Sequence, residues 1–167
     1  KPVLGLATGS TPERTYELLV EKFKNKEVSF KNTTTFNLDE YVGLSPTNEF
    51  SYSYYMNHYL FNHVDIKDEN IFIPNGLAKD LEEECEKFEQ TIKERGPIDL
   101  QILGVGLNGH IGFNEPGTPF TSRTHVAKLE ESTRQANSRF FTSIEEVPKL
   151  ALTMGIGTIM EAKEIIF

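Results

Sequence analysis

The chain has 167 residues, of which 38% are hydrophobic and 25% charged, and it carries a formal net charge of −8. This composition is ordinary for one soluble globular domain with its own core. The acidic balance argues against a nucleic-acid partner, because phosphate backbones attract clustered Lys and Arg. No apolar run approaches the roughly 20 residues that span a bilayer, so we expect no membrane segment. The single cysteine, Cys85, cannot form a disulfide within the chain and fits a cytoplasmic location.

Short apolar runs alternate with helical patterns along the chain. In order, the sequence predicts a strand at 3–7, a helix starting at 10–13 with hydroxyl caps, a strand at 33–38, a helix at 51–62, a strand at 71–73, a helix at 79–95, a strand at 98–103, an edge strand at 124–129, a helix at 131–141, and strands at 151–154 and 164–167. This alternation implies an α/β fold, with a mostly parallel sheet and helices on both faces. We expect residues 1–167 to form a single domain that is cut at both ends, because apolar runs stand directly at each terminus.

In parallel α/β sheets, ligands bind beyond the carboxyl ends of the strands. The first loop at this end of the sheet follows the strand predicted at 3–7 and runs from Ala7 to Pro12. Gly9, Ser10 and Thr11 bring a glycine turn and two hydroxyls to the start of a helix. Free N–H groups and the positive end of the helix dipole make this a candidate anion site. The alternative is an ordinary helix capped by hydroxyls.

The second loop places two adjacent carboxylates, Asp39 and Glu40, where a buried strand emerges. One of them could act as a general base, with a pKa adjusted by partial burial and by its neighbour. The alternative is a turn or helix-capping aspartate, which is the commoner role of a single aspartate in a loop.

The third loop, 104–117, contains a literal G-x-G-x-x-G after a strand. We reject a dinucleotide site, because that fingerprint needs a helix at its third glycine, and Gly112, Pro116 and Gly117 interrupt the following residues. His110 and Glu115 are candidates for proton transfer in a loop whose backbone can approach a ligand closely. The alternative is a structural or solvated histidine. The spacing is not that of a zinc site, and we expect no metal.

Arg139 is a candidate phosphate ligand within Asn137–Phe141. Its aromatic neighbours predict partial burial, and the alternative is an ordinary surface arginine.

Residues 6–12, 36–44, 106–117 and 137–141 together closely resemble the glucosamine-6-phosphate deaminases of the glucosamine/galactosamine-6-phosphate isomerase family. The resemblance runs in order along nearly the whole chain. It implies a Rossmann-like α/β enzyme that needs no cofactor. It also implies an isomerising, hydrolytic deamination of glucosamine 6-phosphate to fructose 6-phosphate and ammonium. Homo-oligomeric assembly stays open.

The resemblance assigns roles to individual residues. Asp39 matches the base that moves a proton between C2 and C1 of the sugar. His110 matches the base that opens the ring, and Glu115 matches its supporting acid. Arg139 joins Glu40 and the Gly9–Thr11 loop in binding the substrate and its phosphate.

Asn108 departs from the family pattern, because many members carry Asp at this position. An amide can orient His110 but cannot stabilise its charge, so we expect Asn108 to be an orienting group. A phosphate-binding lysine of the family lies beyond Phe167.

Three other functions remain as alternatives. The first is a 6-phosphogluconolactonase-like hydrolase, which shares the architecture and a glycine–histidine loop. The second is a non-catalytic sugar-phosphate sensor, and the third and least favoured is a dinucleotide-dependent oxidoreductase. The sequences around Asp39 and Glu115 favour the deaminase over all three.

Overall fold

A five-stranded parallel sheet forms the centre of the computed structural model, which describes residues 1–167. The strand order is β4-β2-β1-β5-β8, and every pairing between neighbours is parallel. The strands are β1 (Val3–Leu6), β2 (Thr34–Asn37), β4 (Ile71–Phe72), β5 (Leu100–Ile102) and β8 (Glu164–Ile166). The predicted α/β fold with a mostly parallel sheet is therefore confirmed.

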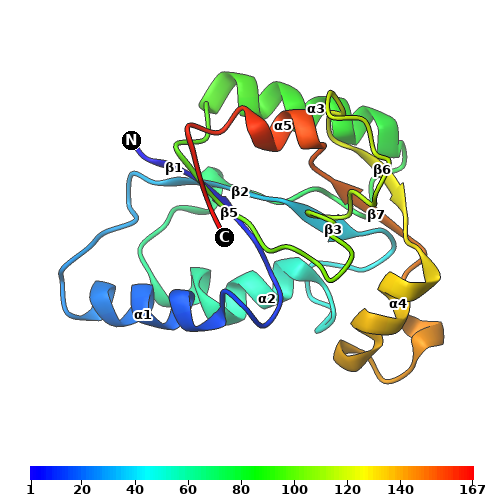
Figure 1. The fold of residues 1–167 in the computed structure, drawn as a ribbon. Helices are drawn as coiled ribbons and strands as arrows, with labels where there is room; N and C mark the ends of the chain where they lie inside the picture. The colour runs from blue at the N-terminus through cyan, green and yellow to red at the C-terminus, as the bar shows by residue number, and fades with distance from the viewer.

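Helices cover both faces of this sheet, as predicted (Figure 1). One face carries α1 (Glu13–Lys24) and α2 (Tyr52–Tyr59), and the other carries α3 (Leu81–Arg95) and α5 (Ile156–Met160). Each pair of helices encloses its own cluster of buried apolar side chains. The first cluster includes Tyr16, Val20 and Met56, and the second includes Phe88, Ile92 and Ile159.

The remaining helices are short. Helix α4 (Glu131–Asn137) lies at the side of the molecule, away from the parallel sheet (Figure 1). The predicted helix at 131–141 is thus a seven-residue α-helix that continues as a 3₁₀ turn. Such turns occupy Phe61–His63, Asp68–Asn70, Ser138–Phe140 and Ile144–Glu146.

A second, antiparallel sheet has the order β3-β7-β6 and was not predicted from the sequence. Its strands are β3 (Asp39–Tyr41), β6 (His125–Lys128) and β7 (Leu150–Thr153). The prediction of an edge strand at 124–129 is confirmed, since β6 stands at the end of this sheet. The prediction that 151–154 closes the parallel sheet is wrong, because β7 pairs with β3 and β6 instead. The loop expected at 39–41 is likewise a strand.

Leu38 joins the two sheets. Its N–H donates to the carbonyl of Leu6 at the end of β1, with N and O 3.0 Å apart, and its carbonyl accepts from the N–H of Met154 at 2.7 Å. The chain therefore passes from β2 to β3 with only one residue between the strands. Because no helix intervenes, the side chains just after Leu38 stay beside the carboxyl ends of β1 and β5.

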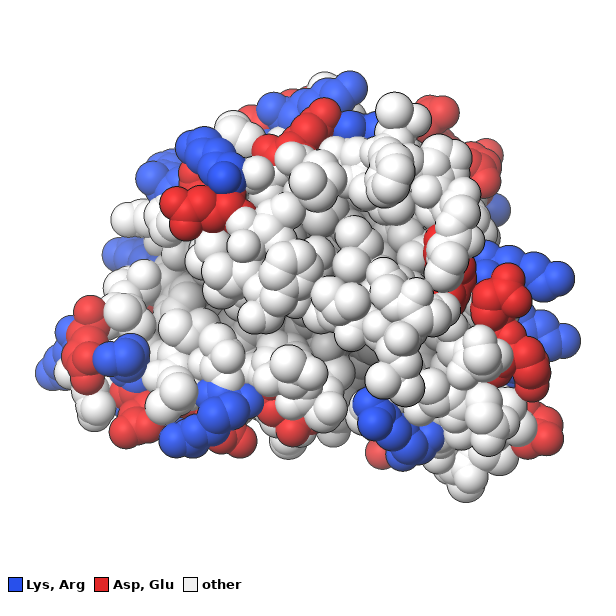
Figure 2. Space-filling view, in the orientation of Figure 1, with Lys and Arg blue, Asp and Glu red and all other residues white.

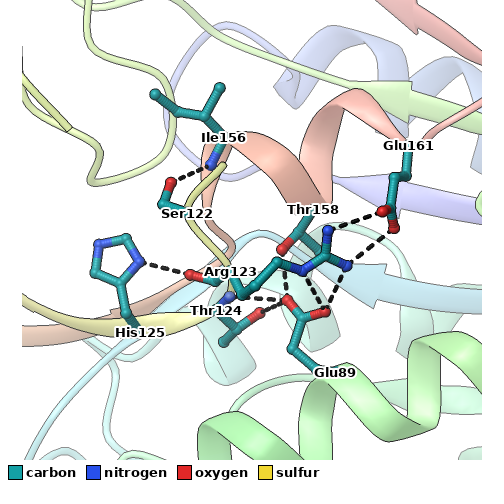
Figure 3. A network of polar contacts seen from close by, with 8 residues as sticks. All are labelled: Glu89, Ser122, Arg123, Thr124, His125, Ile156, Thr158 and Glu161. Atoms are coloured by element: carbon teal, nitrogen blue, oxygen red, sulfur yellow. Dashed lines mark hydrogen bonds and ion pairs between the residues drawn. The ribbon is translucent and has the colours of Figure 1, made fainter. Parts of the chain in front are cut away.

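A buried carboxylate attaches the second sheet to α3 (Figure 3). Glu89 of α3 accepts from the N–H and the hydroxyl of Thr124, both at 2.8 Å, and from the hydroxyl of Thr158 in α5. Arg123 binds Glu89 and also Glu161. Burial alone would raise the pKa of Glu89, but the hydrogen bonds from Thr158, Thr124 and Arg123 together lower it below its ordinary value. The start of β6 is thereby fixed against both helices.

Candidate active site

A cavity of about 400 Å³ opens at the carboxyl ends of the parallel strands. This is within the range of small-molecule sites. All three loops singled out in the sequence contribute to its wall. The polar and charged lining residues include Thr8, Ser10, Thr11, Asp39, Tyr41, Tyr52, His110, Asn137 and Arg139.

Gly9, Ser10 and Thr11 line one end of the cavity. The prediction that the hydroxyls cap the helix is wrong, since α1 begins after Pro12 and no side chain caps it. Both hydroxyl residues are exposed instead. Gly9 has φ +96°, a conformation that glycine adopts without strain. With the hydroxyls free of a capping role, the loop keeps its donors available for an anion at the helix N-terminus.

Asp39 lines the cavity as the first residue of β3 and is only 7% exposed. Burial raises the pKa of its carboxyl to about 8, and the charge of Glu40 adds to the rise. A carboxyl group of this kind can accept and return a proton near neutral pH. The alternative of a capping aspartate does not apply to Asp39, because it lies within a buried strand.

Glu40 occupies a different place from the one predicted, because it does not line the cavity. Successive side chains of a strand point to opposite sides, and its carboxylate faces the start of α2. It accepts from the N–H groups of Tyr41, Tyr52 and Ser53, each at 2.9 Å. Burial raises the pKa of Glu40, and these hydrogen bonds oppose the rise. Its place indicates a structural role, in which it fixes α2 against β3.

Thr153 of β7 brings the glycine loop to Asp39. It pairs with Asp39 across the antiparallel sheet, and its hydroxyl accepts from the N–H of Phe113 at 3.1 Å. Asn114 fastens the same loop by donating to the carbonyl of Met154 at 2.8 Å. Gly112 has φ +55°, and a methyl group added to it would lie 3.6 Å from Asp39 Oδ2 and 2.8 Å from Thr153 Oγ1. Only glycine allows so close an approach.

His110, Asn108 and Glu115 form one hydrogen-bonded chain, of which the sequence led us to expect only the contact between Asn108 and His110. Asn108 Nδ2 donates to Glu115 Oε2 at 2.8 Å, and Asn108 Oδ1 lies 2.6 Å from His110 Nδ1. The imidazole lies against the backbone of Gly106, where an added methyl group would be 2.1 Å from its Cε1. Of the three side chains, only that of His110 lines the cavity. Asn108 is therefore placed as an orienting group between the other two.

Arg139 reaches the cavity from the 3₁₀ turn that follows α4. The predicted partial burial is wrong, because the residue is exposed. Its guanidinium lies over the ring of Phe140, 4.6 Å from the ring centre. Arg139 makes no ion pair with a carboxylate, unlike Arg123 and Arg134. Its charge is thus available to an anionic ligand.

The sequence analysis missed two tyrosines of the cavity wall, Tyr41 and Tyr52. Their ring centres are 4.7 Å apart. Burial raises the pKa of Tyr41 to about 12, and the pKa of Tyr52 is also raised, mainly by burial. Both phenols are therefore neutral at physiological pH. The alternation of a strand could have found Tyr41, which lies two residues after Asp39 and on the same side of β3, but no local pattern indicates Tyr52.

The surface charge does not by itself attract an anion. On the face in Figure 2, basic and acidic side chains stand mostly side by side around the edge, and the centre is uncharged. With a net charge of −8, attraction of a phosphate depends on local donors. The Gly9–Thr11 loop and Arg139 are such donors.

The structure contains no group of three or more His, Cys, Asp and Glu side chains placed to hold a metal ion. No helix has the length and apolar character that crossing a bilayer requires.

A buried carboxyl and an oriented histidine face one cavity at the end of a parallel sheet, and this arrangement makes the cavity the candidate active site of an α/β protein. The chain belongs to the glucosamine-6-phosphate isomerase/6-phosphogluconolactonase family, whose model matches residues 2–167.

Curated relatives resemble the chain closely over almost its whole length. A protein of Oceanobacillus iheyensis named glucosamine-6-phosphate deaminase is 61% identical over 166 residues, which are 99% of this chain and 66% of the relative. Glucosamine-6-phosphate deaminase 1 of Bacillus subtilis is 58% identical over 164 residues, covering 98% of this chain and 68% of the relative. The chain therefore spans about two thirds of the length of these relatives.

Solved structures show the same fold. One described as a monomeric glucosamine-6-phosphate deaminase superimposes with a TM-score of 0.96 at 58% identity, over 98% of this chain and 68% of that one. A 6-phosphogluconolactonase from Thermotoga maritima gives a TM-score of 0.75 at 20% identity, over 99% of this chain and 68% of that one. The second likeness extends to the fold alone.

The raised pKa of Asp39 predicts a pH-dependent effect of replacing it. The folded protein ionises this carboxyl only near pH 8, whereas the unfolded chain ionises it near pH 4, so stability falls as the pH rises between these values. Asp39→Asn removes that loss. We expect urea unfolding to show that the variant has a larger free energy of unfolding than the native protein. The difference should be absent at low pH and grow to about a few kcal/mol by pH 8.

The exposed Asp68 offers a matched control, since Asp68→Asn makes the same change in a solvated carboxylate. It should produce no increase in the free energy of unfolding that grows with pH. If Asp39→Asn and the native protein had parallel stability profiles from pH 4 to 9, the buried carboxyl would not have the raised pKa.

Proposed function

We propose that the protein containing this chain is a glucosamine-6-phosphate deaminase, which converts glucosamine 6-phosphate and water to fructose 6-phosphate and ammonium without a cofactor. The observation that carries the proposal is a single cavity lined by Asp39, His110, the Gly9–Thr11 loop and Arg139. The family and the 56–61% identity to proteins of that name support it. We further propose that the enzyme acts in the cytoplasm.

The first step is opening of the sugar ring. The Nε2 atom of His110 takes the proton of the hydroxyl on C1 as the bond between C1 and the ring oxygen breaks, and the imidazolium returns a proton to that oxygen. An imidazole suits the step, because it both accepts and donates near neutral pH. Asn108 supports the role by engaging Nδ1, which leaves Nε2 for the substrate.

The second step is the shift of a proton from C2 to C1. Asp39 removes the proton from C2 of the open-chain aldehyde, while the ammonium group on C2 gives up one proton and the aldehyde oxygen gains one, which forms a planar enolamine. Asp39 then delivers the carbon-bound proton to C1 on the same face. A positively charged amino group bound nearby would favour the ionised carboxylate and prepare it as a base. Burial supports the role, since the raised pKa makes Asp39 a stronger base than a solvated aspartate.

The product of this step is a ketimine, and its hydrolysis completes the reaction. Water adds to C2, the carbon–nitrogen bond breaks and nitrogen leaves as ammonium. The reaction is thus an isomerisation followed by hydrolysis. The relatives named glucosamine-6-phosphate deaminase support the deamination, and the hydrolytic step is part of the proposal.

The phosphate is bound at the other end of the cavity. The Gly9–Thr11 loop supplies N–H and hydroxyl donors, and Arg139 supplies an unpaired positive charge. Guanidinium groups bind phosphate through two parallel hydrogen bonds, which fix orientation as well as affinity. Fixing the phosphate places C1 and C2 of an aminohexose over the two proton-transfer groups.

A lactonase function is the alternative that the shared fold raises. Hydrolysis of a lactone moves no proton between carbon atoms and needs only one general base for the attacking water, which His110 could supply, so a second base would have no separate task. The lactonase structures are also only 15–20% identical to this chain where the name is given. Asp39 therefore favours the deaminase.

Comparing two substrates tests the proposal. The full-length enzyme should release ammonium from glucosamine 6-phosphate and leave 6-phosphogluconolactone hydrolysis at its spontaneous rate. Asp39→Asn should lower ammonium release by on the order of 10²–10⁴, the usual contribution of a positioned base. Lactone hydrolysis well above the spontaneous rate, with no ammonium release, would assign the chain to the other branch of its family.

A separate prediction concerns phosphate binding by Arg139. Arg139→Ala should raise KM for glucosamine 6-phosphate more than it lowers kcat, because the contact is made in the ground state and the transition state alike. The exposed Arg14 of α1 makes only a surface ion pair, and Arg14→Ala is the control. Steady-state kinetics with glucosamine, which lacks the phosphate, should show little difference between Arg139→Ala and the native enzyme. Equal losses on both substrates would mean that Arg139 acts in folding rather than in binding phosphate.

A further inference from the structure

Thr133 lies outside the cavity wall, yet its hydroxyl contacts Glu115, which is hydrogen-bonded through Asn108 to His110. It is the third residue of α4 and is 5% exposed. Its Oγ1 donates to Glu115 Oε1, while Asn108 donates to the other oxygen, Oε2, at 2.8 Å. Both oxygens of the Glu115 carboxylate are therefore held by donors from different segments of the chain.

This arrangement determines the tautomer of His110. A carboxylate only accepts hydrogen bonds, so the amide group of Asn108 must turn its Nδ2 toward Glu115 and its Oδ1 toward His110. Oδ1 is an acceptor, and the histidine atom 2.6 Å from it, Nδ1, must then carry the proton. Nε2 is left as the unprotonated nitrogen. The orientation of the Asn108 amide is held from both sides, because the backbone N–H of His110 donates to its Oδ1 at 3.2 Å and its Nδ2 donates to the anchored carboxylate of Glu115 at 2.8 Å.

Helix α4 connects this anchor to the phosphate end of the cavity. One turn after Thr133, the amide of Asn137 donates to the phenol oxygen of Tyr41 at 3.1 Å. Arg139 follows two residues later and reaches the same cavity. A single seven-residue helix thus holds Glu115 at one end and the Arg139 turn at the other.

We propose that Thr133 is a positioning residue for His110. Its hydroxyl orients the Glu115 carboxylate, which orients the Asn108 amide, which holds the imidazole in the Nδ1–H form with Nε2 ready to act as the base. The consequence for catalysis rests on the proposed function, in which His110 opens the sugar ring. The consequence for the tautomer does not, and it can be measured without substrate.

The structural alternative is that the Thr133 hydroxyl only helps α4 to pack. Thr133→Val distinguishes the two, because valine keeps the shape and removes the donor. Thr133→Ser restores the donor and removes a methyl group. Thr118→Val serves as the control, since the hydroxyl of Thr118 binds the backbone carbonyl of Glu115 at 2.7 Å and not its carboxylate.

The experiment is ¹⁵N NMR of the imidazole nitrogens in the full-length protein, at about pH 8.5, where an ordinary imidazole is neutral. His110 is identified by the signal that is missing from His110→Gln. We expect the native protein, Thr133→Ser and Thr118→Val to show His110 with the proton on Nδ1. Thr133→Val should show a mixture of the two tautomers.

A native tautomer in Thr133→Val would overturn the proposal, and so would an equal change in Thr118→Val. If Thr133→Val does not fold, Asn108→Leu breaks the same chain one link closer to His110, at an exposed position. It should give the same mixture of tautomers, and an unchanged tautomer there would overturn the proposal equally.

Steady-state kinetics of the same variants distinguishes the positioning role of Thr133 from the ring-opening role of His110. Thr133→Val should lower kcat for glucosamine 6-phosphate by roughly 10- to 100-fold, the usual effect of losing a residue that orients a functional group, with KM within about twofold. Thr133→Ser should recover most of the rate. A changed tautomer with an unchanged kcat would leave Thr133 as a positioning residue and contradict the ring-opening role of His110.

Discussion

The hydrogen bonds of Leu38 to the carbonyl of Leu6 and to the N–H of Met154 hold the two sheets together at one residue. Because the chain changes sheets there without an intervening helix, Asp39 begins the second sheet at the carboxyl end of the first. Thr153, its partner in that sheet, fastens the glycine loop that carries His110. Asp39 and the loop that carries His110 are therefore both attached to the end of β7.

Asp39 and Glu40 are adjacent in the sequence but face opposite sides of β3. The alternation of a strand turns Asp39 into the cavity and Glu40 toward α2. Glu40 has three backbone N–H partners, whereas the Asp39 carboxyl accepts no hydrogen bond from the chain, and burial raises its pKa to about 8. The same local sequence thus supplies a structural anchor, Glu40, and a buried carboxyl with a raised pKa at the cavity, Asp39. Burying an ionisable group without a partner costs stability, which is an expected property of an active site.

Much of the fold could be predicted, because the strongest signals are local. Apolar runs identify the parallel strands, and helical patterns identify α1, α2 and α3, whereas the five-residue helix α5 was not predicted. The antiparallel sheet could not be predicted, since β3 has only three residues and reads as a loop, and its pairing with β7 joins positions more than a hundred residues apart. Nothing in a local pattern reports such a contact.

The residues of the site also differ in whether the sequence could indicate them. Residue type and spacing indicated Asp39, His110 and Arg139, and all three line the cavity. The resemblance placed Glu40 among the substrate-binding residues, whereas the alternation of the strand turns its side chain away from the cavity. Thr133 could not be found at all, since its role depends on a tertiary contact with Glu115 across 18 positions. The sequence therefore indicates the side chains that line the cavity better than the tertiary contacts that orient them.

The central claim is that Asp39 and His110 act on different steps, one on carbon-bound protons and the other on the ring. The most direct measurement is incorporation of deuterium from solvent into fructose 6-phosphate, by NMR, with ammonium present and the full-length enzyme. Exchange at the sugar carbon needs Asp39 but not a closed ring. We predict that His110→Gln retains measurable exchange while net turnover largely stops, and that Asp39→Asn loses both, by on the order of 10²–10⁴. Equal loss of exchange in the two variants would contradict this division of roles.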